Sequence, residues 1–176
     1  PDLLHRRALN RTREVMDEVL YGDKFTEDGY KKSEELVSEI LEQLTTKEVR
    51  VINLLKDIKS FDEYLYYHSI NVGMLTALML KKRRKFGINE TRNIVLGSYL
   101  CDIGKIKMEK TLLDKPETLT ESEMIEMHLH PQLGYNIVKS LEDINPVVLQ
   151  TILFHHEQFD DEGYYSLPYD SLPSSP

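Results

Sequence analysis

The sequence contains a single cysteine, Cys101, among its 176 residues. One cysteine excludes an internal disulfide framework and fits a reducing compartment. No apolar run approaches the roughly 20 residues that a helix needs to span a bilayer. The beginning of the sequence also lacks the apolar core of a signal peptide. Together, these absences predict a soluble, cytoplasmic chain that does not interact with membranes.

Positive charge is also scarce, with 22 Lys and Arg residues against 30 Asp and Glu residues, a formal net charge of −8. General nucleic-acid binding requires a basic surface that replaces counterions, so this composition argues against it. An anionic ligand would need local positive groups, such as metal ions and a few lysines. The length suits one domain, and 40% hydrophobic residues are enough for a real core.

Apolar residues recur every three or four positions, and this spacing predicts an all-α protein. One set forms a helical face with Leu36, Ile40 and Leu44, and a second set forms a face with Val51, Leu55 and Ile58. The following segment has His68, Val72, Leu75 and Met79 at i, i+4, i+7 and i+11. The pattern therefore places His68 on a buried helical face. Residues 91–103 contain the mainly apolar run IVLGSYLCDI, which predicts a buried helix.

The later helices carry clear start signals. Thr120 and Glu123 have the spacing of a capping box, and Pro131 is expected to open a separate helix. Asn145 and Pro146 read as an N-cap followed by proline at the first helical position. The segment from Phe159 onward is rich in Gly, Pro, Ser and Asp and predicts an extended loop. The total is about seven or eight helices in one domain.

Five of the six histidines, together with Cys101 and Asp102, are distributed over separate predicted helices, where they would be able to converge on metal ions. Each also has a simpler interpretation. His68 alone is more often a core residue, His155 and His156 would complement a helix dipole, and Cys101 would be a small core hydrophobe. Asp102 is harder to explain, because a buried charge requires a cation. Either Lys105 at i+3 or a metal ion would supply it.

Five segments appear in the order and spacing of a known family: FDEYLYYHSINVG, YLCDIGKIKM, LLDKPETLTESE, HLHPQLGYNIV and HHEQFDDEGYY. On these motifs the chain resembles the HD-GYP domain, a subgroup of the HD phosphohydrolases that includes the cyclic-di-GMP phosphodiesterases. The resemblance runs from about Phe61 to Leu172. It implies a single helical HD-domain bundle, with lead-in helices in residues 1–60 and the metal-binding core in residues 61–176.

The resemblance also implies a set of site residues. Metal ligands would be His68, Asp102, His130, His155 and His156, with Cys101 in the first position of the His-Asp doublet. Asp102 would bridge two divalent ions, of which iron or manganese suits imidazole and carboxylate ligands best and zinc is an alternative. Lys105 would steady the scissile phosphate, and Asp102 would hold the metal ions. The resemblance therefore implies that Lys105 and Asp102 are the catalytic residues. Lys105 and Lys115 would contact the substrate.

The chain departs from the family pattern at several places. Cys101 replaces the histidine of the doublet, and a thiolate ligand would add negative charge to the site. The family's Gly-Tyr-Pro triplet reads Gly163-Tyr164-Tyr165. Tyr64 stands where some members have a glutamate that holds a third metal, so two metals are expected. The family's further Asp ligand and its last helices would follow Pro176, so the resemblance implies a C-terminally incomplete domain.

Two functions from different classes follow from these features. The first is a metal-dependent phosphodiesterase that hydrolyses cyclic-di-GMP or a related cyclic dinucleotide in bacterial second-messenger signalling, with other signalling domains as partners. The second is a degenerate HD-GYP module that binds a nucleotide or a protein without catalysis. The retained polar residues favour the enzyme, whereas Cys101 and Tyr165 favour the binding module.

Overall fold

The computed structural model describes residues 3–22, 24–46, 61–83, 85–158 and 163–164. All regular structure in these ranges is helical and none of it is strand, so the predicted all-α bundle is confirmed. The elements are α1 (Leu3–Gly22), α2 (Glu27–Thr46), α3 (Phe61–Arg83), α4 (Ile88–Leu100), the 3-10 helix η2 (Ile103–Lys107), α5 (Lys110–Leu113), α6 (Glu121–Met127), α7 (His130–Lys139) and α8 (Pro146–Phe154).

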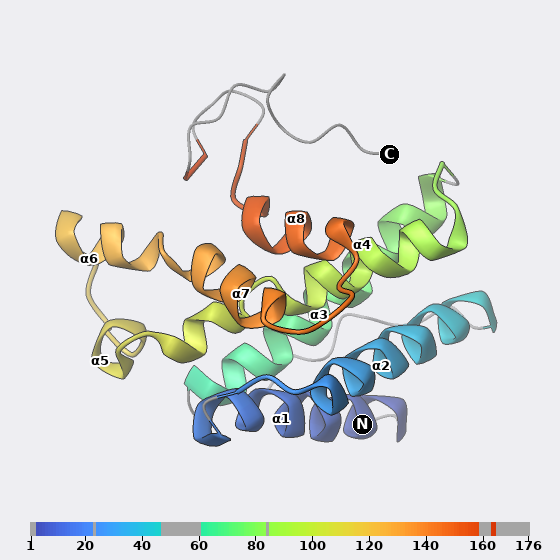
Figure 1. The fold of residues 1–176 in the computed structure, drawn as a ribbon, viewed down its shortest axis with the longest axis horizontal. Helices are drawn as coiled ribbons and strands as arrows, with labels where there is room; N and C mark the ends of the chain where they lie inside the picture. The colour runs from blue at the N-terminus through green and yellow to red at the C-terminus, as the bar shows by residue number, and fades with distance from the viewer. Residues whose placement is uncertain (1–2, 23, 47–60, 84, 159–162, 165–176) are drawn as a thin grey trace.

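Helix α4 lies at the centre of the bundle, in contact with α2, α3 and α8. The pair α1 and α2 lies at the bottom of the view in Figure 1, and α7 and α8 lie on the opposite side of α3 and α4. The residues from Val95 to Leu100 are all buried, which confirms the predicted buried helix. The central helix therefore ends inside the protein, immediately before Cys101 and Asp102.

The N-terminal helices belong to the same core as the later ones. Leu36, Ile40 and Leu44 are each at most 3% exposed, so the predicted buried face of α2 is confirmed. One cluster of buried hydrophobic side chains runs from Ala8 in α1 to Ile152 in α8. The second predicted face, with Val51, Leu55 and Ile58, lies outside the described residues.

The predicted buried face of α3 is wrong. Leu75 is 50% exposed and Met79 is 65% exposed, and the side chain of His68 is 34% exposed. The buried residues of this helix are instead Leu65, Tyr66, Ser69, Ile70, Gly73, Met74 and Ala77. Apolar residues occur on more than one side of α3, so the spacing of three and four residues fits two different stripes of side chains. The buried stripe contains the small residues Gly73 and Ala77, and a Cβ at Gly73 would lie only 3.4 Å from the Cβ of Tyr99. Close packing against α4 therefore selects this stripe.

The helices around the site start where the sequence predicted. The hydroxyl of Thr120 accepts a hydrogen bond from the backbone N–H of Glu123, and the Glu123 carboxylate accepts one from the N–H of Thr120, which completes a capping box for α6. The Asn145 side chain accepts a hydrogen bond of 2.9 Å from the N–H of Val147 at the start of α8. Pro131 occupies the first turn of α7.

The C-terminal prediction is largely outside the described residues, which include only Gly163 and Tyr164 of the expected loop. The division at residue 60 stays a prediction, because residues 47–60 are also outside the description. Among the described helices, none has an apolar stretch long enough to cross a bilayer.

Candidate metal centre

Asp102 lies at the point where α4 gives way to η2, with only 3% of its side chain exposed. The first turn of α7 reaches this carboxylate because η2 packs tightly against α7 at Gly104. A Cβ at Gly104 would lie 2.5 Å from the backbone nitrogen of Gly134 and closer still to the carbonyl oxygen of His130. Glycine is therefore the residue that allows the two backbones to approach, and this approach places His130 beside Asp102.

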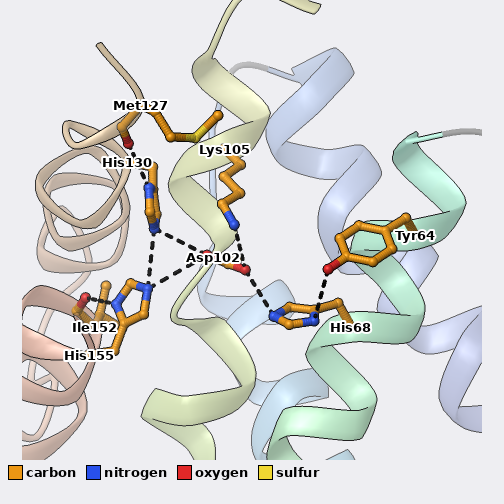
Figure 2. A network of polar contacts seen from close by, with 8 residues as sticks. All are labelled: Tyr64, His68, Asp102, Lys105, Met127, His130, Ile152 and His155. Carbon is orange, nitrogen blue, oxygen red and sulfur yellow. Dashed lines mark hydrogen bonds and ion pairs between the residues drawn. The ribbon is translucent and has the colours of Figure 1, made fainter. Parts of the chain in front are cut away.

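The two carboxylate oxygens of Asp102 face different groups (Figure 2). Oδ2 lies 2.9 Å from the ammonium of Lys105 and 3.2 Å from Nε2 of His68. Oδ1 lies 3.2 Å from Nε2 of His130 and 3.6 Å from Nε2 of His155. Burial opposes ionisation of this carboxyl, but the His68 imidazole and the Lys105 charge beside Oδ2 outweigh it. They hold the pKa of Asp102 well below its usual range.

The backbone orients two of the imidazoles. Nδ1 of His130 lies 2.8 Å from the carbonyl oxygen of Met127, and Nδ1 of His155 lies 2.8 Å from the carbonyl oxygen of Ile152. A carbonyl oxygen only accepts hydrogen bonds, so the proton of each neutral ring belongs on Nδ1. Each Nε2 then carries a lone pair, and the two Nε2 atoms lie 3.2 Å apart.

Three electron-rich atoms therefore meet in a buried space: Nε2 of His130, Nε2 of His155 and Oδ1 of Asp102. Among the described residues, no hydrogen bond donor reaches Oδ1 in suitable geometry, although His130 lies nearby. Buried lone pairs that face one another repel unless a cation lies between them. Asp102, His130, His155 and His156 each offer a ligand atom, and these atoms all lie within 4.8 Å of one another. This donor set fits a divalent metal ion.

His156 and His68 complete the histidine cluster from two sides. Burial, followed by the neighbouring His155 and His130, lowers the pKa of His156 to about 4, so its ring is neutral near pH 7. A neutral imidazole is the form that binds metals. His68 approaches from α3, where the ring of Tyr64 stacks on it at 5.4 Å between centroids and the Tyr64 hydroxyl lies 3.5 Å from Nδ1.

Two predicted site residues lie apart from this cluster. Cys101 is 5% exposed at the C-terminal end of α4, and its thiol is not part of the four-residue group. Burial, followed by the Asp102 charge, raises the pKa of that thiol. Lys115 forms an ion pair of 2.6 Å with Glu123 of the capping box. The roles of Cys101 as a ligand and of Lys115 in substrate binding stay predictions.

Sequence reasoning gave no role at the site to Tyr164, an aromatic residue beside the cluster. Tyr164 stacks on His156 with ring centroids 4.1 Å apart and on His128 with centroids 3.8 Å apart. The available signal was the Gly163-Tyr164 pair of the C-terminal motif, but the sequence did not show where this pair would return to the bundle.

Comparison with known proteins indicates the family of the chain. Residues 34–168, more than half of the chain, match a family model described as an HD domain. The chain is 31% identical over 132 residues to a cyclic di-GMP phosphodiesterase of Pseudomonas aeruginosa, covering 72% of this chain and 31% of that protein. It is 28% identical over 145 residues to a cyclic di-GMP phosphodiesterase of Thermotoga maritima, covering 81% and 36%.

A third relative is the 3′3′-cGAMP-specific phosphodiesterase 2 of Vibrio cholerae, 26% identical over 140 residues, with 70% of this chain and 27% of that protein covered. The chain thus spans about a third of the length of the relatives it matches. No solved structure matches it. An HD domain together with a buried cluster of aspartate and histidines supports binding of divalent metal. The family match and these relatives lead to one conclusion: the chain belongs to the HD-domain family, in the HD-GYP group that its motifs resemble.

Proposed function

We propose that this domain is a metal-dependent phosphodiesterase that hydrolyses cyclic-di-GMP or a related cyclic dinucleotide. The observation that carries the proposal is the convergence of Oδ1 of Asp102 with Nε2 of His130 and Nε2 of His155 in a buried space. A bound cation would remove the repulsion between these lone pairs and would so explain why they converge. The names of the relatives support a phosphodiester of the cyclic dinucleotide class as the substrate.

The proposed ligands divide between the two oxygens of Asp102. His130 and His155 lie on the side of Oδ1, whereas His68 lies on the side of Oδ2. This division supports Asp102 as a bridging ligand between two divalent ions, with iron or manganese proposed first and zinc second. Ions bound there would supply a Lewis acid and a source of hydroxide near neutral pH.

Lys105 is the proposed contact for the scissile phosphate. Its side chain is 18% exposed and its ammonium lies 2.9 Å from Oδ2 of Asp102, so it lies at the site and is partly open to solvent. A chain with a net charge of −8 needs such a local cation to attract an anionic phosphodiester. The low pKa of Asp102 keeps its carboxylate ionised, which maintains both the ligand charge and the orientation of Lys105.

The alternative function is a binding module without catalysis. The specific observation in its favour is Cys101, because this residue replaces the histidine of the doublet and its thiol lies outside the four-residue group. A site with one ligand fewer would still bind a metal or a nucleotide.

The test is hydrolysis of cyclic-di-GMP and 3′3′-cGAMP by protein purified without oxygen, with iron, manganese and zinc measured per chain. Lys105→Gln is expected to lower kcat/KM at least about 100-fold while metal content stays unchanged, since its charge acts on the phosphate. The matched control is Lys107→Gln, because Lys107 lies on the same 3-10 helix but directs its ammonium to the carbonyl oxygen of Val19 at 3.3 Å. Metal uptake without hydrolysis of either dinucleotide would reject the enzyme and leave the binding module.

A further inference from the structure

The three clustered histidines are oriented by different means. His130 and His155 each have Nδ1 at 2.8 Å from a backbone carbonyl oxygen, and this contact fixes both the tautomer and the plane of the ring. Within the part of the chain that the structure describes, the ring of His156 has no hydrogen bond of this kind. It nevertheless belongs to the group of atoms that converge within 4.8 Å. Another contact must therefore fix its plane.

Tyr164 provides such a contact. Its ring lies nearly parallel to that of His156, with an interplanar angle of 13° and centroids 4.1 Å apart. It is also nearly parallel to His128, at 23° and 3.8 Å. Two rings this close to a third cannot share one of its faces without overlapping, so His128 and His156 lie on opposite faces of Tyr164. The tyrosine ring is therefore held as the middle layer of three.

The backbone before Tyr164 explains how the ring reaches this position. Gly163 is buried, and a Cβ there would lie 2.6 Å from the Cα of Glu157 and 2.9 Å from the backbone nitrogen of Gln158. Any larger residue would push the returning chain away from the end of α8. The glycine thus brings Tyr164 back over the histidine that immediately precedes Glu157.

We propose that Tyr164 is a positioning residue of the metal centre, which fixes the plane of the His156 imidazole by stacking, with His128 as the support behind it. The ring of the tyrosine is what matters, and its hydroxyl is dispensable. The inference rests on the proposed function only in that it requires the metal centre, and it is independent of catalysis. Groups that orient a metal ligand typically change metal affinity by about 10- to 100-fold.

The experiment titrates metal-free protein with Mn²⁺ and with Zn²⁺ and measures the dissociation constant of each. Tyr164→Leu is expected to weaken binding at least about tenfold, whereas Tyr164→Phe stays within about twofold of the unchanged protein. Tyr21→Leu is the control for the loss of a tyrosine, since Tyr21 is 80% exposed on α1. Circular dichroism and thermal unfolding of the metal-free variants verify that they fold. If Tyr164→Leu does not fold, His128→Gln tests the same stack from its outer side, with an expected loss of about two- to fivefold.

A double-mutant cycle separates a role through His156 from a general effect. In a His156→Ala background, Tyr164→Leu is expected to cause no further loss of affinity, because the ring that it orients is gone. An equal loss in both backgrounds would overturn the proposal, as would a Tyr164→Phe variant as weak as Tyr164→Leu. If the unchanged chain takes up neither metal, the proposed function fails and this inference fails with it. If it binds metal and Tyr164→Leu binds equally well, only the positioning role fails.

Discussion

Gly104→Ala should disturb the fold and the metal centre together, because Gly104 is where η2 and α7 touch. Ordinary packing keeps a Cβ about 3.4 Å or more from backbone atoms, whereas a Cβ at Gly104 would lie 2.5 Å from the nitrogen of Gly134. One of the two backbones must then move by about 1 Å to clear this nitrogen, and further to clear the carbonyl oxygen of His130. Neither obstructing group is a flexible side chain, so the displacement is transmitted to α7 as a whole.

The expected loss of stability follows from this overpacking. Inserting a methyl group into a filled core costs about 1–3 kcal/mol. For a chain of this size, each kcal/mol lowers Tm by about 2–4 °C, which gives a decrease of about 2–12 °C. Metal affinity should fall as well, because His130 is the first residue of α7 and ligand bonds of about 2.0–2.2 Å tolerate little displacement from Asp102.

Thermal unfolding of the metal-free variant, followed by metal titration, provides the measurement. Gly22→Ala is the matched control, since a Cβ there meets nothing within 4 Å and the residue ends α1. It should unfold at the same temperature as the unchanged protein or slightly higher, because alanine is the better helix former. A Gly104→Ala protein with unchanged Tm and unchanged metal affinity would refute the tight contact between η2 and α7.

Three further outcomes are expected. Asp102→Ala should abolish uptake of iron, manganese and zinc, since both of its oxygens face proposed ligands, and equal metal content per chain would remove the bridging role. If Cys101 is a ligand, as the resemblance implies, it would bind as a charged thiolate, and Cys101→His would put a neutral imidazole in its place. On the proposed function, Cys101→His should therefore hydrolyse cyclic-di-GMP about tenfold faster, or about 1.4 kcal/mol in barrier. Steady-state rates check this, and no gain would leave Cys101 as a core residue. Glu123→Gln should lose stability only above acidic pH: hydrogen bonding from Lys115 and Thr120 lowers the pKa of Glu123 from 4.5 to about 2, so its contribution is present above about 4.5 and vanishes toward pH 2. Urea unfolding of both proteins across this range measures the gap, and a gap independent of pH would contradict it.

Helix starts were predictable because their signals are local. The capping box of Thr120 and Glu123 and the N-cap at Asn145 depend on side chains within three residues of the backbone groups they bind. The approach of Lys105 to Asp102 is similarly local, at a separation of three residues. The resemblance to HD-GYP domains predicted which histidines would lie near Asp102 in the structure.

Features that depend on packing between distant segments were not predictable. The buried face of α3 was misassigned because Leu75 and Met79 match the same spacing as the true stripe, and only the approach of α4 to Gly73 distinguishes them. The stack of His128, Tyr164 and His156 joins residues that no periodicity relates. Likewise, the orientation of the His130 ring follows from a backbone carbonyl whose direction the sequence does not show.

Three of the proposed ligand residues sit at helix ends: Asp102 follows α4, His130 opens α7 and His155 closes α8. The buried stripes of these helices, which hold the bundle together, are for the most part made of other residues. Selection would therefore be able to replace a residue at a helix end while the buried stripes continue to specify the same bundle. Cys101, at the position where the family has histidine, is an example of such a replacement. In evolutionary terms, the metal preference of such a domain is free to drift, and even to be lost, long before its architecture is.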